Sequence, residues 1–164
     1  GGNPRMGAEG AGSLAGALGG CAALAHLDLS DNKIGDEGVG KLADVLAQCK
    51  ALVHLDLIGN AISAEGAGRL AGVLGACSAL ACLDLSSNAI GDEGAAKLAA
   101  VLGSCSTLTH LDLTINKIGP EGAGKLVKEL GAATSLTHLD LRSNSIVAGH
   151  TAELKGSLHA RLLV

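Results

Sequence analysis

The chain has 164 residues, a length that suits one domain. Hydrophobic residues make up 48% and the mean hydropathy is +0.39, which excludes an intrinsically disordered protein. No apolar run approaches the roughly 20 residues of a membrane span. Phe, Tyr and Trp are absent and the net charge is −4, whereas nucleic-acid binders stack bases on aromatic rings and attract phosphates with basic surfaces. We therefore expect neither a nucleic acid nor a membrane as partner.

An internal repeat of 28 residues organises the chain without any gap. Each full copy opens with the pattern L-x-x-L-x-L and reaches an Asn at its ninth position. The full copies are 24-51, 52-79, 80-107 and 108-135. A partial repeat, 5-23, matches only the second half of a copy, and a divergent terminal repeat, 136-163, starts like the others and then drifts. Because such copies stack on one another, we expect residues 1-164 to form a single domain.

Each copy predicts a short strand followed by a helix. The L-x-L alternation has the period of a strand, and the second half carries apolar residues at helical spacing. The partial repeat 5-23 supplies a helix without its strand. The helices that follow are expected at about 36-48, 64-76, 92-104 and 120-132. The terminal repeat ends in a last helical segment, 152-164, and we expect residues 148-160 to form a partial cap, whereas the N-terminal edge is uncapped.

Two further columns recur in the repeat. An Asn follows each strand, where its side chain can bond otherwise unpaired backbone groups and form a ladder: Asn32, Asn60, Asn88, Asn116 and Asn144. A Gly lies in the first turn of each full helix, where it is unfavourable: Gly38, Gly66, Gly94 and Gly122. The simplest reason for the Gly column is a close approach of helix to strand, which a Cβ would block.

The pattern LxxLxLxxNxI resembles the leucine-rich repeat family, in its 28-residue class similar to ribonuclease inhibitor. Similar repeats occur in nucleotide-binding innate-immune receptors and in the Ran GTPase-activating protein. The resemblance covers residues 5-163 and implies an α/β fold. This is a leucine-rich repeat solenoid, or horseshoe, with an inner parallel sheet and outer α-helices. It implies no cofactor and does not say which partner is bound.

Some of the charges have a structural explanation. Each full helix carries a Glu in its first turn and a Lys or Arg four residues later, which is a stabilising helical pair, as in Glu37 and Lys41. The strand carboxylates are different, because they occupy one outward position in five successive copies: Asp28, Asp56, Asp84, Asp112 and Asp140. Neighbouring like charges repel, so something should offset them.

A second outward column, two residues earlier, could offset these carboxylates through imidazole hydrogen bonds. It contains His26, His54, Cys82, His110 and His138. One interpretation is a solvated polar ladder on an open face, and the other is an acidic recognition surface for a basic partner. We expect no dedicated metal site, because a linear ladder lacks the tetrahedral convergence that zinc prefers.

The remaining cysteines also recur at 28-residue intervals: Cys21, Cys49, Cys77 and Cys105. Their expected separation, near the ~10 Å between helices, is too long for disulfides, so we interpret them as small buried hydrophobic residues. Five cysteines without secreted-type clustering favour a reducing compartment, and hence a cytoplasmic protein. Neither a P-loop, nor GxSxG, nor HExxH occurs, so we expect no enzyme.

The sequence predicts a non-catalytic module that binds a protein partner on the concave sheet face, with a basic partner suited to its acid column. Alternatives are a regulator of a small GTPase, the sensing or autoinhibitory domain of a larger receptor, and a scaffold that is part of a larger chain or assembly. Residues that differ between copies could encode the partner's shape: Ile58, Cys82, Ile115 and Arg142. Together with the two columns they form the expected partner-binding set: His26, Asp28, His54, Asp56, Ile58, Cys82, Asp84, His110, Asp112, Ile115, His138, Asp140 and Arg142.

Overall fold

Strands and helices alternate along the chain in the computed structural model, which describes residues 6–147 and 162–163. The helices are α1 (Gly7–Leu18), α2 (Gly35–Leu46), α3 (Ala64–Leu74), α4 (Gly91–Leu102) and α5 (Pro120–Glu129). The strands are β1 (His26–Asp28), β2 (His54–Asp56), β3 (Cys82–Asp84), β4 (His110–Asp112), β5 (His138–Asp140) and β6 (Leu162–Leu163).

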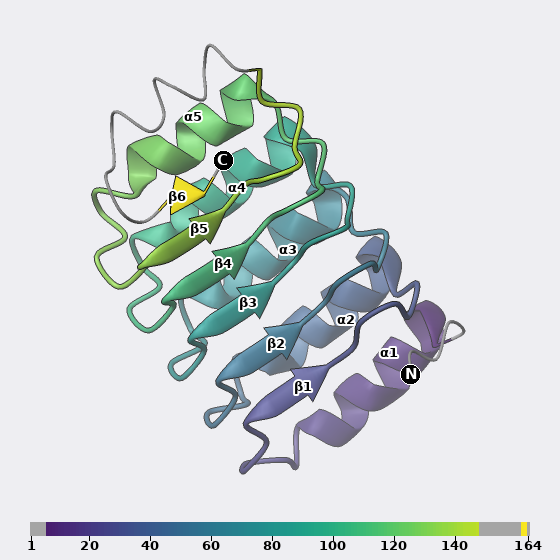
Figure 1. Cartoon of the computed structure of the whole chain (residues 1–164). Coiled ribbons are helices and arrows are strands. Elements are labelled where there is room, and N and C mark those ends of the chain that lie inside the picture. The colour runs from purple at the N-terminus through teal and green to yellow at the C-terminus, as the bar shows by residue number, and fades with distance from the viewer. Residues whose placement is uncertain (1–5, 148–161, 164) are drawn as a thin grey trace.

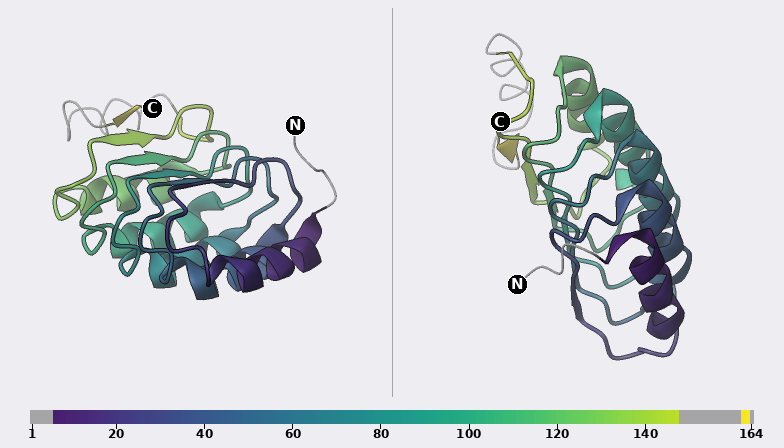
Figure 2. Two further views of the ribbon diagram at one scale, coloured as in Figure 1. Left: turned by 90° about the horizontal axis from the view of Figure 1, so that it is seen from below. Right: turned by 90° about the vertical axis from the view of Figure 1, so that its right-hand side faces the viewer.

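The strands form one parallel sheet in the order β1-β2-β3-β4-β5-β6, and the helices cover one side of it (Figure 1). Figure 2 shows the two layers side by side, with the helices following one another along the outside of the stack. We call the side of the sheet turned away from the helices the concave face. This arrangement confirms the predicted α/β leucine-rich repeat solenoid.

The core lies between the two layers and consists almost wholly of aliphatic side chains. In the copy 52-79, Leu55 and Leu57 from the strand region meet Leu70 and Leu74 from α3, and all four are at most 3% exposed. The same positions are buried in the later copies, so a continuous leucine core runs through the stack. Burial of this apolar surface is the main stabilising contribution, at about 25 cal/mol per Å².

The predicted asparagine ladder is confirmed. The Oδ1 atom of Asn60 accepts the backbone N–H groups of Asn32 and Ile34 in the preceding copy, at 3.1 and 3.2 Å. Its Nδ2 atom donates to the carbonyl of Leu29 at 2.8 Å. Asn88 and Asn144 repeat these bonds to the copies before them. The side chains therefore satisfy backbone groups where the strands end, and they bond successive copies together.

The helices end two or three residues earlier than predicted. After α2, the N–H of Cys49 bonds the carbonyl of Leu46 at 3.0 Å, so the chain turns toward the next strand. Equivalent turns follow α3 and α4. None of the helices in the ranges 6–147 and 162–163 is long and apolar enough to cross a membrane.

The explanation predicted for the glycine column is wrong in one respect. A Cβ on Gly38 would lie 2.5 Å from the Cγ2 of Ile34, the residue just before its own helix, and 3.0 Å from the Cα of Ala8 and 3.1 Å from the Cβ of Ala11 in the preceding helix. At Gly94 the corresponding atoms belong to Ala64 and Ala67 of α3, at 3.1 and 3.2 Å. The close approach is therefore between neighbouring helices rather than between helix and strand.

The two ends differ from the expected pattern to different degrees. At the N-terminus, α1 packs on α2 without a strand of its own, as predicted. At the other end, Leu162 and Leu163 were expected to be helical, and they instead form β6, parallel to β5. The N–H of Leu141 donates to the carbonyl of Leu163 at 2.7 Å, so β6 pairs backbone groups at the edge of β5. The expected cap at 148-160 lies outside the described residues.

Candidate protein-binding face

The two predicted columns lie in register on the concave face. Each strand pairs with the next so that His26 is opposite His54 and Asp28 is opposite Asp56, and the same alignment continues to His138 and Asp140. Because the strands are parallel and unshifted, the 28-residue period of the sequence becomes two straight rows. Neighbours within a row are separated by one strand spacing, about 4.8 Å.

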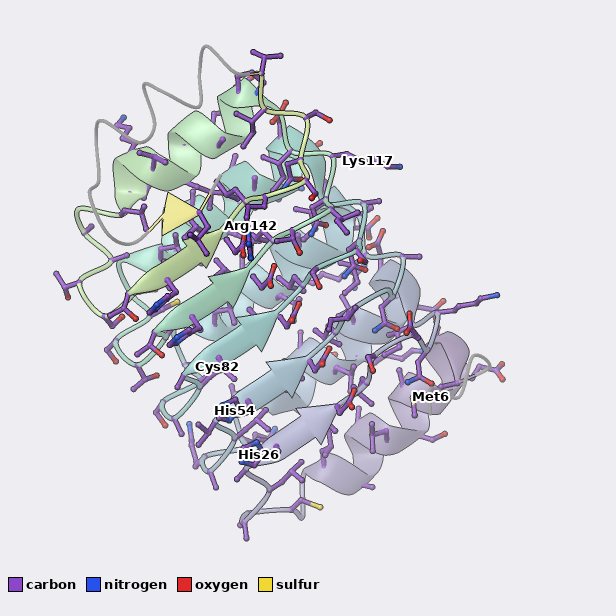
Figure 3. The ribbon with its side chains drawn as sticks, in the orientation of Figure 1. Met6, His26, His54, Cys82, Lys117 and Arg142 are labelled. Carbon is purple, nitrogen blue, oxygen red and sulfur yellow. The ribbon has the colours of Figure 1, made fainter. Side chains whose placement is uncertain are left out.

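The first row consists of two stacked imidazole pairs separated by a thiol. The rings of His26 and His54 stack at 4.4 Å, and those of His110 and His138 at 4.3 Å with planes only 6° apart. Cys82 lies between the pairs, and Figure 3 shows His26, His54 and Cys82 following one another across the starts of their strands. The sequence placed these residues in one row, but it did not predict the stacking.

Threonines beside the second pair were missed by sequence reasoning. The Oγ1 atom of Thr109 lies 2.8 Å from Nδ1 of His110, and Oγ1 of Thr137 lies 2.9 Å from Nδ1 of His138. The same hydroxyls bond backbone carbonyls of the preceding copy, at 3.0 and 3.1 Å. The first pair lacks this support, because Ala25 and Val53 occupy the equivalent positions.

The expected hydrogen bonds between the His and Asp columns do not form among the described residues. Residues two apart on one strand face lie roughly 7 Å from each other, which is too far. Each carboxylate instead accepts the backbone N–H two residues later, as Asp56 does from Ile58 at 2.9 Å and Asp112 from Thr114 at 2.8 Å. Asp28, Asp84 and Asp140 make the same contact. These bonds stabilise the end of each strand and leave most carboxylates without a cation.

The carboxylates of the Asp row differ in pKa because they differ in burial. At the exposed end, the N–H of Ser30 lowers the pKa of Asp28 below its ordinary value. Further along, desolvation by burial raises the pKa of Asp56 and of Asp112, with smaller contributions from the neighbouring carboxylates. The row therefore has an exposed beginning and a half-buried middle, although its sequence is uniform.

The last carboxylate of the row has its own counter-ion. The guanidinium of Arg142 donates to both oxygens of Asp140, with Nε at 3.0 Å from each and one terminal nitrogen at 2.5 Å from Oδ2. This pair raises the pKa of Arg142 through the hydrogen bond and the charge of Asp140. Arg142 was predicted as a partner-binding residue, and the structure places it at the end of β5, where it neutralises Asp140 (Figure 3).

The helical side of the molecule shows the opposite arrangement, because the predicted Glu-to-Lys or Glu-to-Arg pairs all form. Each pair has an N–O distance of 2.8 Å: Glu37–Lys41, Glu65–Arg69, Glu93–Lys97 and Glu121–Lys125. These four glutamates are thus paired within the chain. Four carboxylates of the concave row, those of Asp28, Asp56, Asp84 and Asp112, have no such ion pair within the described part of the chain.

The concave face is hollowed along these rows. The larger hollow, of about 410 Å³, extends from β1 to β4 and is lined by side chains of both rows and by the leucines between them, from His26 and Asp28 to His110 and Asp112. A smaller hollow, of about 180 Å³, lies between β4, β5 and β6. Ten of the thirteen predicted partner-binding residues, the His/Cys and Asp columns, thus lie on one hollowed surface or its edge.

The two isoleucines of the predicted set are not brought together. Ile58 is half-buried and its backbone bonds Asp56 and Asp31, whereas the side chain of Ile115 is exposed at 55%. Neither residue lines the hollows between the described strands. Ile115 has a left-handed backbone conformation with φ of +55°, which is unusual for a β-branched residue.

The cysteines are all free thiols. Cys49, Cys77 and Cys105 are buried as predicted, and burial raises the pKa of each. The prediction is wrong for Cys21, which is exposed. Cys82 is half-buried with a raised pKa, again because of burial, which disfavours the reactive thiolate. Among the described residues, no three His, Cys, Asp or Glu side chains converge as metal ligands would.

Comparison with known proteins agrees with this geometry. The chain is similar in structure to "Leiomodin-1 Actin-Binding Site 2 (ABS2)", with a TM-score of 0.70, 20% identity, and coverage of 92% of this chain and 84% of that one. It is also similar to a tropomodulin C-terminal domain from Caenorhabditis elegans, with a TM-score of 0.73, 15% identity, and coverage of 92% and 90%. At these identities the likeness shows the fold.

No curated protein matches the chain in sequence. The family described as "Leucine Rich repeat" matches five segments: 20–43, 48–71, 76–99, 104–127 and 132–146. These segments cover more than half of the chain and follow its 28-residue period. The chain belongs to the leucine-rich repeat family.

Proposed function

We propose that this protein is a non-catalytic recognition module that binds a basic segment of a protein partner across its concave face. One observation carries the proposal: four glutamates in the first turns of α2 to α5 are paired with Lys or Arg, whereas four carboxylates of the concave row lack an ion pair within the described residues. Repulsion within such a row is relieved when a partner brings positive charge.

The shape of the face supports the same proposal. The larger hollow runs across four strands, and carboxylates and imidazoles of both rows line it. An extended or helical segment of a partner could lie in it with basic groups over the carboxylates. Recognition of this kind is sensitive to salt, because solvent-accessible charges are screened within about 8–10 Å.

The finer parts of the prediction belong to this proposal. They are the single domain over residues 1-164, the ribonuclease-inhibitor-like class, the cytoplasmic location, and membership of a larger chain or assembly. The location is supported by five free thiols. The similar structures give no support to the GTPase-regulator alternative, and the receptor-domain alternative rests on the family resemblance alone.

A charge-matched pair of triple variants tests the proposal. Asp56, Asp84 and Asp112 are changed to Asn in one variant, since Asn Oδ1 can still accept the backbone N–H two residues later. Glu65, Glu93 and Glu121 on the helices are changed to Gln in the control, so both proteins lose the same charge. Binding of a fluorescent Lys/Arg-rich peptide is measured by anisotropy at two salt concentrations.

We expect the concave variant to weaken peptide binding by about tenfold and the helical control to change it little, because several partly exposed ion pairs of about 0.2–1 kcal/mol each are lost only in the first. Equal weakening in both variants would show that net charge alone attracts the peptide and would contradict the proposal. Because one similar structure is an actin-binding site, monomeric actin is the protein probe in a second arm. If the concave variant binds actin as tightly as the wild-type protein does, actin binds at another surface.

A further inference from the structure

We propose that the smaller hollow is a pocket for one arginine side chain of the bound segment, with the imidazoles of His110 and His138 as hydrogen-bond acceptors. The hollow has a volume of about 180 Å³ and is lined by His110, Leu111, Asp112, His138, Asp140 and Leu163. This inference deepens the proposed function and rests on it, because it assigns one contact of the partner to one place on the concave face.

The first step is the tautomer of the two histidines, which follows from the hydrogen-bond network. Thr109 Oγ1 lies 3.0 Å from the carbonyl oxygen of Ala81, and Thr137 Oγ1 lies 3.1 Å from that of Thr109. We take each hydroxyl to donate its single proton to that carbonyl, which also accepts the backbone N–H groups of the same threonine and of the histidine after it. The contacts of 2.8 and 2.9 Å from these hydroxyls to Nδ1 of His110 and His138 then need a proton on the ring nitrogen.

The second step is what this tautomer leaves free. A neutral imidazole with its proton on Nδ1 carries a bare lone pair on Nε2. No donor from the described residues reaches either Nε2 atom. Both rings are held through Nδ1 by equivalent threonines, and they stack at 4.3 Å with planes 6° apart. The two acceptors therefore lie side by side and point the same way, so a ligand that satisfies both must bring at least two donors.

The third step is the charge in the hollow. Asp140 is already paired with Arg142, whereas Asp112 is half-buried and uses Oδ1 to accept the N–H of Thr114. Oδ2 of Asp112 has no hydrogen-bond donor within the described residues. One carboxylate without a cation and two neutral acceptors make a site that repels anions and suits a cation with several N–H groups. Guanidinium fits best, because it carries five donors in a planar fork, and the exposed Leu163 can contact its stem.

The other histidine pair provides an internal contrast. His26 and His54 also stack, at 4.4 Å, but Ala25 and Val53 precede them and no hydroxyl bonds their Nδ1 atoms in the described structure. Their tautomers are not fixed by the protein. The two histidine pairs of the row therefore differ, and only the pair beside the threonines has its acceptor nitrogens fixed in advance.

The tautomer is tested first, on the full chain at pH 8, by long-range ¹⁵N NMR of the imidazoles. We expect His110 and His138 to hold the proton on Nδ1, and His26 and His54 to show the usual mixture. The double variant Thr109→Val, Thr137→Val should lose this preference, and Thr109→Ser, Thr137→Ser should keep it, because serine retains the hydroxyl. A proton on Nε2 of His110 and His138 in the wild-type protein would overturn the inference.

Binding is tested with the peptide Ac-Gly-Gly-Arg-Gly-Gly-NH₂ and with its citrulline counterpart, which has a similar shape but no charge. We expect the arginine peptide to shift the resonances of His110, His138 and Asp112, and the citrulline peptide to bind at least tenfold more weakly. The Val double variant should weaken arginine binding by about tenfold, the effect of losing a hydrogen bond to a charged group, and the Ser double variant should restore it.

The outcomes separate this inference from the proposed function. If the arginine peptide binds the Val double variant as well as the wild-type protein, or shifts His26 and His54 instead, the arginine pocket is wrong. The proposed function still stands in that case if the longer basic peptide remains sensitive to the Asp-to-Asn triple variant. If the triple variant does not weaken binding of that longer peptide, while the arginine peptide still shifts the resonances of His110 and His138, the pocket stands and the Asp row is not the docking surface.

Discussion

The carboxylate of Asp92 in α4 caps the helix of the following repeat, because its Oδ1 atom accepts the N–H of Gly122 at 2.9 Å. The same oxygen accepts the N–H of Gly119 at 2.7 Å. Helix N-termini leave four N–H groups unpaired, and α5 has no capping side chain of its own because Gly119 precedes it. Asp36 caps α3 in the same way, through the N–H groups of Ser63 and Gly66.

Removal of this cap should loosen two repeats at once. We expect Asp92→Ala to lower the free energy of unfolding by about 1–2 kcal/mol, the usual cost of a lost helix cap. Asp92→Asn should cost less, because its Oδ1 atom can still accept both bonds. Asp44→Ala is the control, since Asp44 is an exposed helical aspartate without a hydrogen bond in the described structure. Urea titrations measure all three, and equal losses for Asp92→Ala and Asp44→Ala would contradict the capping role.

These caps show what the sequence could and could not predict about the fold. The 28-residue period predicted the strands, the helices and the asparagine ladder, because each repeats in every copy. The caps alternate instead: Asp36 and Asp92 are 56 residues apart, and the copies that follow each of them have Ala64 and Pro120 at this position. Comparison of every second copy could have found the recurring Asp. Its role as a cap could not be predicted, because it depends on how one helix lies against the next.

Some features of the candidate site could likewise be predicted from the sequence, and others could not. Straight rows of His and Asp followed from the unshifted register, which an ungapped repeat requires. The stacking of His110 on His138 depends on ring rotamers, and the pairing of Asp140 with Arg142 depends on a residue found in one copy only. The burial that separates Asp28 from Asp112 is a property of position along the stack, which a repeated sequence does not encode.

Two glycines of α5 should respond in opposite ways to alanine. A Cβ on Gly122 would lie 2.6 Å from the Oδ1 and 2.8 Å from the Cα of Asp92, and 3.1 Å from the Cβ of Ala95. The capping carboxylate would have to move, and α4 and α5 would have to separate. We expect Gly122→Ala to cost about 1–3 kcal/mol. Gly124 has open space at its Cβ position, so Gly124→Ala should stabilise the protein by up to about 1 kcal/mol through helix propensity. Thermal unfolding of both variants checks this, and a stabilising Gly122→Ala would contradict the close helix contact.

The cysteines should fall into two classes toward a thiol reagent. Cys21 is exposed and should react rapidly in the folded protein, whereas Cys49, Cys77 and Cys105 should react only on unfolding, because burial hides them and raises each thiol pKa. Cys105→Ala should cost about 1 kcal/mol and Cys21→Ala almost nothing. Mass spectrometry after timed labelling measures the first effect. A chelator should leave the unfolding curve unchanged, and a large shift would reopen the question of a metal.

Replacement of Ile115 by a residue that tolerates the left-handed conformation should stabilise the protein. Its φ of +55° is shared by equivalent residues such as Asp31 and Ser87, which accept it more readily than a β-branched side chain. We expect Ile115→Asn to raise the free energy of unfolding by about 1 kcal/mol, and Ile115→Val, which keeps the β-branch, to leave it unchanged. If Ile115 contacts the partner at the rim, the Asn variant should also bind it less tightly. A destabilised Asn variant would show that the Ile115 side chain contributes packing.

The carboxylates of Asp112 and Asp28 should give the unfolding free energy opposite dependences on pH. Desolvation raises the folded pKa of Asp112 above its unfolded value near 3.8, so the folded chain binds a proton more readily than the unfolded chain. The contribution of Asp112 to stability is therefore greatest below that value and is lost as the pH rises through the folded pKa. Asp112→Asn should remove this loss and stabilise the protein at pH 7, by less than about 1 kcal/mol because solvent screens a half-exposed group.

Asp28 is the matched control from the same row. Its folded pKa is lowered by the N–H of Ser30, so its contribution is present above the unfolded pKa and is lost as the pH falls through the folded value. Asp28→Asn should therefore leave the protein no more stable at pH 7, and its difference from the wild-type protein should vanish in acid. Urea unfolding at intervals from pH 3 to pH 7 measures both curves. Two variants whose pH dependences change in the same direction would show that burial along the stack does not distinguish these carboxylates.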